Sequence, residues 1–338
     1  MEKMIIDFRS DTVTKPTEGM RKAMYEAEVG DDVLGDDPTV KKLEERICSL
    51  LGTESALFVS SGTQANLLSI MSHCERGDEY IAGQSAHCYS HEGGGAAVLG
   101  SIQPQPVEFK GDGTLSLDEV EAKIKPDDFH FARTRLLCLE NTQDGKALPL
   151  DYMKEASLFC RGKNLSFHLD GARLFNAAAA ANVPAKEIAS LFDTVSVCLS
   201  KALGAPIGSL MCGKKENIDT ARRWRKVLGG GMRQAGIIAA AGLYALENNI
   251  ERLCEDHENA KLLAEGLSDI KEMEIIYQAT NMVFVKLLKG DPASLASVLK
   301  NDGILILPGK IIRFVTHLDV NKPDILKTAD LIEKYFIS

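Results

Sequence analysis

Short apolar runs alternate with longer amphipathic stretches between residues 56 and 199, and this alternation limits the possible folds more than any other feature. The apolar runs have the length and composition of buried strands, whereas the stretches between them have a helical period. Strands that alternate with helices are typical of a mostly parallel sheet with helices on its faces. The expected strands are residues 56–60, 79–82, 136–140, 166–170 and 194–199, and two expected helices are residues 63–74 and 151–161.

A second unit is expected near the C-terminus. A long helical pattern rich in Ala and Leu follows Gly236, passes Leu253 and continues to Leu267. Strand-like stretches follow at 274–287, 304–307 and 311–316, with a helix from Lys322 onward. A chain of 338 residues exceeds the size at which one hydrophobic core usually stops growing. We therefore expect an N-terminal segment plus a large domain over residues 1–250 and a smaller α/β domain over residues 251–338.

The charge balance argues against a nucleic-acid partner. The formal net charge is -9, whereas binding to phosphate backbones needs clustered Lys and Arg. One basic run, residues 222–226, is either a solvated helix face or a local anion site.

The sequence also predicts a cytoplasmic protein without a membrane partner. No apolar stretch approaches the roughly 20 residues needed to cross a bilayer. Asp7 and Arg9 come before any signal-peptide apolar region could form. The eight cysteines form no Cys-x-x-Cys pair and no zinc-like spacing, so we expect reduced thiols and no metal site.

Reactive groups follow several of the expected strands, at the sheet edge where parallel α/β proteins bind ligands. The first set is residues 60–66, Ser-Ser-Gly-Thr-Gln-Ala-Asn, where Gly62 permits a close backbone approach and a helix begins. Free N–H groups at a helix start favour an anion such as phosphate, although Ser-Gly-Thr is also an ordinary helix cap. The chain has no Gly-x-Gly-x-x-Gly fingerprint, so dinucleotide binding lacks its main support.

Two further strand ends carry Asp170 and Lys201. A lone Asp in such a place is usually a turn former, but a Lys beside buried apolar residues must find a partner, shift its pKa or form a covalent bond. One helical crossover separates the two, which puts them on neighbouring parallel strands. A Schiff-base Lys, an Asp for the pyridinium nitrogen and a phosphate-binding turn are together typical of a pyridoxal-phosphate site.

The order of these motifs resembles the low-specificity L-threonine aldolase family, whose members have the aspartate-aminotransferase-like fold of pyridoxal-phosphate enzymes. The resemblance covers nearly the whole chain. It rests on residues 8–16 (Phe-Arg-Ser-Asp-Thr-Val-Thr-Lys-Pro), 30–32 (Gly-Asp-Asp), 61–66, 168–173 (His-Leu-Asp-Gly-Ala-Arg), 199–201 (Leu-Ser-Lys) and 313–317 (Arg-Phe-Val-Thr-His).

The resemblance implies cleavage of L-threonine or L-allo-threonine to glycine and an aldehyde, with pyridoxal 5'-phosphate bound to Lys201. Asp170 would pair with the ring nitrogen, Arg173 would face the ring hydroxyl side, and His87 would stack on the pyridine face. The phosphate would be held by Gly62, Thr63 and Ser200. The substrate carboxylate would be held by Ser10 and Arg313.

The resemblance also implies a homotetramer built from two dimers, with active sites at the dimer interface. The stretch 225–234 is similar to the family segment that reaches a neighbouring site, so Arg233 and Lys226 would meet the phosphate across that interface. In two places the chain departs from the family pattern. Leu34 replaces a usual Tyr, and Gln143 replaces a usual His, which removes a hydroxyl and an imidazole from the surroundings of the substrate.

The base that accepts the β-hydroxyl proton is left open between His87, His130 and a water on the phosphate. His130 matches a family position near the substrate hydroxyl, but its local sequence is also that of a loop histidine before a strand. His87 and His91 are four residues apart, yet no Glu stands in the metalloprotease position. Three rival functions remain: β-elimination or transamination on the same fold, a pyridoxal-phosphate carrier without turnover, and an NAD-dependent enzyme.

Overall fold

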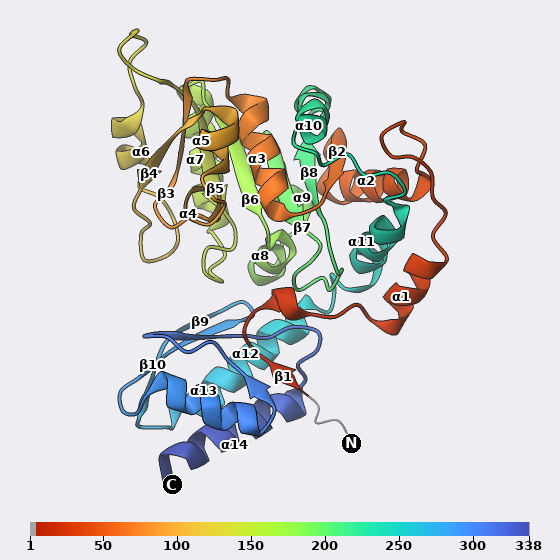
Figure 1. Ribbon diagram of the computed structural model, residues 1–338. Helices are drawn as coiled ribbons and strands as arrows, with labels where there is room; N and C mark the ends of the chain where they lie inside the picture. Colours follow the sequence, from red (N-terminus) through yellow and green to blue (C-terminus); the bar gives the residue numbers. More distant parts are fainter. Residues whose placement is uncertain (1–4, 338) are drawn as a thin grey trace.

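The structure is a computed structural model that describes residues 5–337, and it contains a large sheet unit and a smaller C-terminal unit (Figure 1). The N-terminal segment runs between the two units before it enters helix α1 (Glu18–Tyr25). Within residues 5–337, no helix is both long enough and apolar enough to span a bilayer.

The large unit is built on a seven-stranded sheet with the order β2-β8-β7-β6-β5-β3-β4. Its strands are β2 (Ser55–Val59), β3 (Asp78–Gly83), β4 (Gln103–Val107), β5 (Arg133–Glu140), β6 (Ser166–Gly171), β7 (Thr194–Cys198) and β8 (Ser209–Gly213). Only β8 runs antiparallel to its neighbours, β2 and β7. The expected mostly parallel sheet is therefore confirmed, with one reversed strand.

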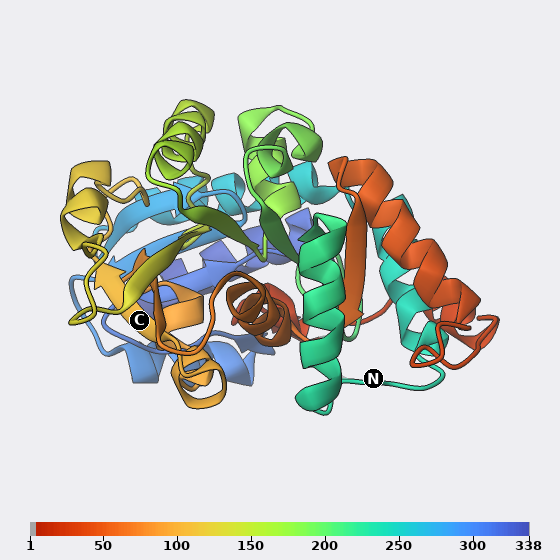
Figure 2. The same ribbon diagram turned by 90° about the horizontal axis from the view of Figure 1, so that it is seen from above.

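Alternating side chains of the central strands pack into separate cores on the two faces of the sheet. Phe58 points into the core shared with α2 (Pro38–Leu51), α6 (Leu117–Lys123), α7 (Leu150–Gly162) and α9 (Ala185–Ala189). Its neighbour Leu57 points into the opposite core, beneath α3 (Gly62–His73) and α10 (Lys215–Val227). Figure 2 shows α7 and α3 on opposite sides of the sheet, with α5 (Gly95–Gly100) on the α3 side. Burial on both faces explains why the strands are continuous apolar runs.

The small unit contains a three-stranded antiparallel sheet, β12-β10-β9, packed on helices. Its strands are β9 (Met273–Ala279), β10 (Met282–Leu287) and β12 (Ile312–Val315), and its helices are α12 (Leu253–Ser268), α13 (Pro292–Asn301) and α14 (Lys322–Ile337). A short pair joins β1 (Ile6–Asp7) to β11 (Ile304–Leu305), so Ile6 and Phe8 lie in the core of this unit. We propose that the boundary between the large and the small domain lies near residue 250. The start of the chain then packs on the small domain.

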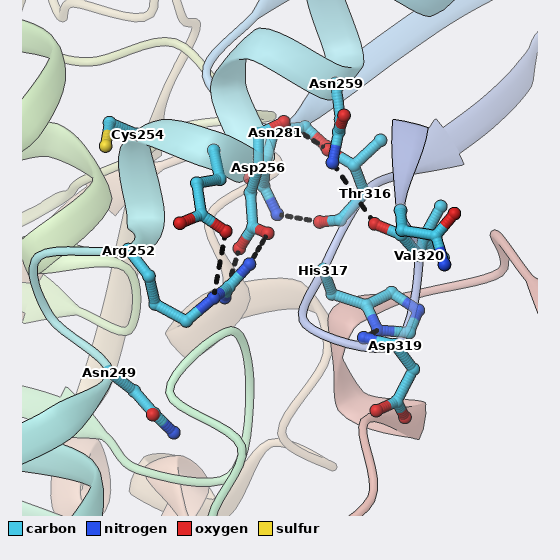
Figure 3. Close-up of polar contacts among 12 residues, drawn as sticks. Asn249, Arg252, Cys254, Asp256, Asn259, Asn281, Thr316, His317, Asp319 and Val320 are labelled. Atoms are coloured by element: carbon cyan, nitrogen blue, oxygen red, sulfur yellow. Dashed lines mark hydrogen bonds and ion pairs between the residues drawn. The ribbon is translucent and has the colours of Figure 1, made fainter. Parts of the chain in front are cut away.

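A buried polar network ties α12 to the strand that carries Arg313 (Figure 3). Arg252 forms an ion pair with the fully buried Asp256, one helical turn away. The Thr316 hydroxyl donates to the Asp256 carbonyl oxygen at 2.6 Å, and Asn281 donates from its amide to the Thr316 carbonyl oxygen at 2.9 Å. These bonds hold the end of β12 in place, and with it the position of Arg313.

Local departures from the predicted elements have local causes. The helical pattern after Gly236 is interrupted, because α11 (Gly236–Asn248) ends where Asn249 turns its side chain to donate to the Leu203 carbonyl oxygen. Strands β4 and β8 were not predicted. Strand β4 contains Pro104 and Pro106, which cannot donate to a ladder and are tolerated because β4 is an edge strand.

Candidate active site

The turn between β2 and α3 has the geometry of an anion-binding site. Ser61 is the N-cap of α3, and its hydroxyl accepts from the N–H of Gln64. The N–H groups of Gly62 and Thr63 have no hydrogen-bond partner among residues 5–337. A Cβ on Gly62 would lie 2.7 Å from the Cys198 sulfur, so only glycine fits here. Two free N–H groups at a helix start are well placed to receive a phosphate.

Asp170 lies at the end of β6, and Lys201 follows the neighbouring parallel strand β7, as the sequence predicts. In the register of β6 and β7, Asp170 lies opposite Ser196, and Lys201 comes three residues after β7 ends. Asp170 is 3% exposed and accepts from the backbone N–H of Ala172 and the amide of Asn66. Its carboxylate is therefore fixed in direction, while Lys201 is only half-buried.

His87 stands at the start of the short helix α4 (His87–Ser90), after β3. Its backbone N–H donates to Glu140 at 2.7 Å, and its Nδ1 lies 2.7 Å from Oε1 of Glu92. The hydrogen bond with Glu92 raises the pKa of His87, and the charges of Asp170 and Lys201 also act on this ring. His87, Asp170 and Lys201 therefore lie close enough for their charges to interact, and the His87 ring stacks on that of His91 with 5.7 Å between the ring centroids.

Arg173 meets a partner that the sequence did not suggest. Its guanidinium donates two hydrogen bonds to the carboxylate of Asp11, at 2.6 and 2.7 Å. Burial alone would raise the pKa of Asp11, but the charge and hydrogen bonds of Arg173 outweigh it and lower the pKa to about 2. The N-terminal segment thereby docks at the pocket and places Ser10 beside it.

Arg313 lies on the pocket side of β12. It is half-buried, its Nη2 lies 3.4 Å from the Arg9 carbonyl oxygen, and the charges of Arg173 and Asp11 act on it. Burial lowers the pKa of Arg313. Among residues 5–337 no carboxylate forms an ion pair with Arg313, and a partly desolvated guanidinium of this kind is suited to bind a carboxylate from a ligand.

Two carboxylates of the pocket were missed by the sequence analysis. Glu140 ends β5 and lies next to Asp170 in the register of β5 and β6. Burial and the nearby charge of Asp170 raise the pKa of Glu140 to about 7. Glu92 follows α4, and its side chain is only 4% exposed. An acid directly after the apolar run 136–139 could have revealed Glu140, but no local signal marks Glu92.

Three of the predicted residues lie elsewhere within their own chain. His130 lies just before the N-terminal end of β5, whereas Glu140 lies at the C-terminal end of the same strand. The His130 ring forms a hydrogen bond with Asp128. Arg233 forms an ion pair with Asp31 in the loop that follows α1. Lys226 lies in the last turn of α10. One chain alone therefore does not bring His130 to the pocket.

The two departures from the family pattern have different surroundings. Leu34 is 71% exposed in the loop before α2. Gln143 is buried and takes part in the turn that packs against the small unit, where its side-chain amide donates to Asp144. Tyr277 donates to the Asp144 carbonyl oxygen from β9, so this turn links the two units near Arg313.

His87, Glu92 and Asp170 form a compact group whose ligand-type atoms lie within 4.8 Å of one another, close enough to surround a metal ion. Hydrogen bonds already engage these atoms, from His87 to Glu92 and from Asn66 to both carboxylates. We therefore interpret the group as a hydrogen-bonded network, and the absence of a metal stays a prediction.

The arrangement fits pyridoxal phosphate on its own geometry. The free N–H groups of Gly62 and Thr63 suit a phosphate, the oriented carboxylate of Asp170 suits a protonated ring nitrogen, and Lys201 supplies a primary amine in the same pocket. The buried hydroxyl of Ser209 has no hydrogen-bond partner within the described residues 5–337 and lies near Gly62, which adds a donor on that side.

Comparison with known proteins agrees with this assignment. The family model described as β-eliminating lyase matches residues 7–289. The chain is 54% identical to the low specificity L-threonine aldolase of Escherichia coli K12, over 96% of this chain and 97% of that protein. It is 42% identical to low-specificity L-threonine aldolase 1 of Arabidopsis thaliana, over 98% and 97%.

Two solved structures share the fold. A Leishmania major threonine aldolase superimposes with a TM-score of 0.85 at 22% identity. The match covers 98% of this chain and 100% of that one. A Sphingomonas wittichii serine palmitoyltransferase gives a TM-score of 0.77 at 18% identity, covering 98% and 86%. At these identities the likeness concerns the fold, and it confirms the expected aspartate-aminotransferase-like architecture.

Proposed function

The chain belongs to the β-eliminating lyase family, among the low-specificity L-threonine aldolases, and from this premise we propose how its pocket works. The protein is a carbon–carbon lyase that uses pyridoxal 5'-phosphate and cleaves L-threonine or L-allo-threonine to glycine and acetaldehyde. Other β-hydroxy-α-amino acids would give glycine and the matching aldehyde. The observation that carries the proposal is the meeting of Lys201, Asp170 and the free N–H groups of Gly62 and Thr63 at one sheet edge.

Each residue of the pocket has a proposed task. Gly62, Thr63 and Ser200 would hold the phosphate, Lys201 would carry the cofactor, and Asp170 would keep a proton on the ring nitrogen. The bound cofactor supplies an electron sink for the electron pair of the breaking Cα–Cβ bond. Asp11 occupies Nε and Nη2 of Arg173, which leaves Nη1 to donate toward the ring hydroxyl.

Arg313 and Ser10 are proposed to hold the substrate carboxylate. A guanidinium offers two parallel donors, which fixes the rotation of the amino acid about its Cα as well as its position. Holding that rotation would select which bond at Cα is broken, and so would direct the reaction toward Cα–Cβ cleavage.

His87 is the proposed base for the β-hydroxyl proton, because its ring lies in the pocket and the hydrogen bond with Glu92 raises its pKa. A raised pKa makes the ring a stronger proton acceptor. A water held by the phosphate remains a second route. His130 could act only from another subunit, because within its own chain it lies at the N-terminal end of β5, away from the pocket.

We also propose a homotetramer, arranged as two dimers with the active sites at the dimer interface. Lys226 and Arg233 would then reach the phosphate of the neighbouring subunit. Phe129, beside His130, is 93% exposed, which suits a loop that inserts into another copy. Sedimentation velocity of the wild type and Phe129→Ser tests this, since a monomeric wild type would contradict it.

We propose a cytoplasmic location, with no nucleic-acid or membrane partner. All eight cysteines are free and most are buried, as is usual in a reducing compartment. The net charge of -9 disfavours polyanions.

The decisive experiment records the visible spectrum of the purified protein with pyridoxal phosphate, before and after glycine, L-threonine and L-allo-threonine are added, and analyses the products. Glycine plus acetaldehyde supports the proposal. A 2-oxo acid with ammonia would indicate β-elimination, and a cofactor spectrum that no amino acid changes would indicate a carrier without turnover.

A further inference from the structure

His87 is held from two sides by two different glutamates. Glu140, at the end of β5, accepts from its backbone N–H, and Glu92 contacts its ring at Nδ1. The first bond fixes where α4 begins, whereas the second fixes the rotation of the imidazole. The side chain of His87 is 46% exposed, and the contact to Glu92 and the stacking on His91 orient its ring.

Glu92 is an acid in an unusual position, because its side chain is 4% exposed and no Lys or Arg forms an ion pair with it among residues 5–337. Its Oε1 atom receives both of its side-chain contacts, from His87 at 2.7 Å and from the amide nitrogen of Asn66 at 2.8 Å. A buried carboxylate without donors would be costly, so these two groups are what stabilises it.

Asn66 joins Glu92 to Asp170. Its amide nitrogen has two N–H groups, and it donates to Glu92 and, at 2.7 Å, to Oδ2 of Asp170. The orientation of the amide is unambiguous, because its oxygen accepts from the Ser196 hydroxyl at 2.8 Å and lies 3.3 Å from Nε2 of His168. In a flipped amide the oxygen would lie against the carboxylates of Glu92 and Asp170, which would be repulsive. Asn66 is 1% exposed, so water does not compete for these bonds.

This network sets the tautomer of His87. An ionised carboxylate can only accept, so Nδ1 of the neutral ring must carry the hydrogen and Nε2 must carry the lone pair. Nε2 is therefore left as the acceptor on the far side of the ring. The charged and titratable groups that face His87 are Glu92 after α4, Asp170 on β6, Glu140 on β5, Lys201 after β7 and His91 on the stacked side.

We propose that Glu92 is the positioning residue that makes Nε2 of His87 the proton acceptor for the substrate hydroxyl, and that Asn66 couples this base to the carboxylate that holds the ring nitrogen. This inference rests on the proposed function, in which His87 is the base. One amide thus holds Glu92 and Asp170 at fixed positions. His87, the proposed base, and Asp170, the proposed partner of the ring nitrogen, are thereby held in one rigid unit.

The electrostatics support the geometric argument. Burial raises the pKa of Glu92, and the charge of Asp170 raises it further, while the bonds from His87 and Asn66 oppose both effects. The hydrogen bond with Glu92 raises the pKa of His87. The charge of Glu92 also raises the pKa of His87, so loss of that charge should lower it.

The test is Glu92→Gln in the holoenzyme, because a glutamine oxygen can still accept from Nδ1 but carries no charge. We expect kcat/KM to fall by roughly 10²-fold, at the lower end of general acid–base effects. The acid limb of its pH profile should move to lower pH by about one unit, the low end of the effect of a nearby charge. A purely structural role would lower kcat/KM at every pH and leave the limb in place.

A second readout does not depend on turnover. In holoenzyme labelled with [15N]histidine, the ring-nitrogen signals of His87 are assigned by their loss in His87→Phe and followed against pH. In the wild type we expect a neutral ring protonated at Nδ1, and in Glu92→Gln a lower pKa. Glu92→Asp, which keeps the charge but shortens the side chain, should keep most of the pKa and only part of the rate.

Glu44→Gln is the matched control, since Glu44 is also a buried acid whose pKa is raised by burial, but it lies on α2 beside Arg222. Its pH profile should match that of the wild type. An unmoved limb and an unchanged His87 pKa in Glu92→Gln would overturn the inference. A wild type that forms no glycine would instead overturn the proposed function, so the two failures are distinguishable.

Asn66→Leu tests the coupling, because leucine keeps the volume and removes both donors. We expect the His87 titration and the visible spectrum of the bound cofactor to change together. A change in only one of them would show that Asn66 does not join the two acids.

Discussion

Asp11 and Arg173 are 162 residues apart in the sequence, yet Oδ1 and Oδ2 of Asp11 accept hydrogen bonds from Nη2 and Nε of Arg173 at 2.6 and 2.7 Å. The Asp11 side chain is fully buried and that of Arg173 is 13% exposed. This bidentate pair fastens the N-terminal segment to the large sheet beside the pocket. It also restricts Arg173 to one face of the site.

Asp11→Asn should destabilise the fold by about 3–5 kcal/mol at pH 7, because it leaves a buried guanidinium without its counter-charge. The pKa of Asp11 is lowered to about 2 in the folded protein. Its contribution is therefore fully present above the unfolded value near 4 and is lost as the pH falls toward 2. Urea denaturation across pH 2–7 measures this difference.

The control for this variant is Asp330→Asn, which removes an exposed ion pair with Lys334. Its effect should stay within about 0–1 kcal/mol, as for other surface pairs. Equal losses in the two variants would contradict a special role for Asp11.

Lys201→Ala should abolish turnover and the visible absorbance of the bound cofactor, because only a primary amine can form the covalent link. The protein should remain folded, since the Lys201 side chain forms no hydrogen bond or ion pair among residues 5–337, and the bond that its backbone carbonyl accepts from Gly204 survives the substitution. Absorbance and circular dichroism spectra check both points. Full activity in this variant would end the assignment of Lys201.

Arg313→Lys should raise KM for L-threonine strongly, because an ammonium does not reproduce the two parallel donors of a guanidinium. The expected loss is roughly 1.5–3 kcal/mol, as for a hydrogen bond to a charged group. Steady-state kinetics with L-threonine and L-allo-threonine measure it. If KM stayed unchanged, the carboxylate site would have to lie elsewhere, with Lys226 or Arg233 as the next candidates.

Gly62→Ala should weaken cofactor binding at least tenfold, about 1.4 kcal/mol, because its Cβ would lie 2.7 Å from the Cys198 sulfur and push the turn off its position. Gly95→Ala is the matched control, since its Cβ would meet only Leu67 at 3.7 Å, an ordinary contact. Equilibrium dialysis with pyridoxal phosphate compares the two. Equal affinities would show that the turn after β2 does not hold the phosphate.

The strands and the reactive groups at their ends could be predicted from the sequence because their signals are local. A strand buried on both faces is an apolar run, and the turn after it shows its Gly, Asp or Lys within a few residues. The predicted strand 166–170 lies within β6 (Ser166–Gly171), and Asp170 stands at its end as expected. The fold and the cofactor followed from the order of such motifs.

Only the tertiary structure decided which distant groups meet. Asp11 reaches Arg173 because β1 pairs with β11 and carries the N-terminal segment across the pocket, a pairing that no local pattern encodes. Asn66 reads as an ordinary helix residue, yet the crossing of α3 over the sheet puts its amide between two carboxylates from separate elements. Periodicity reports which face of an element is buried, whereas the partner across that face depends on strand register and helix crossing, and these exist only once the chain is packed.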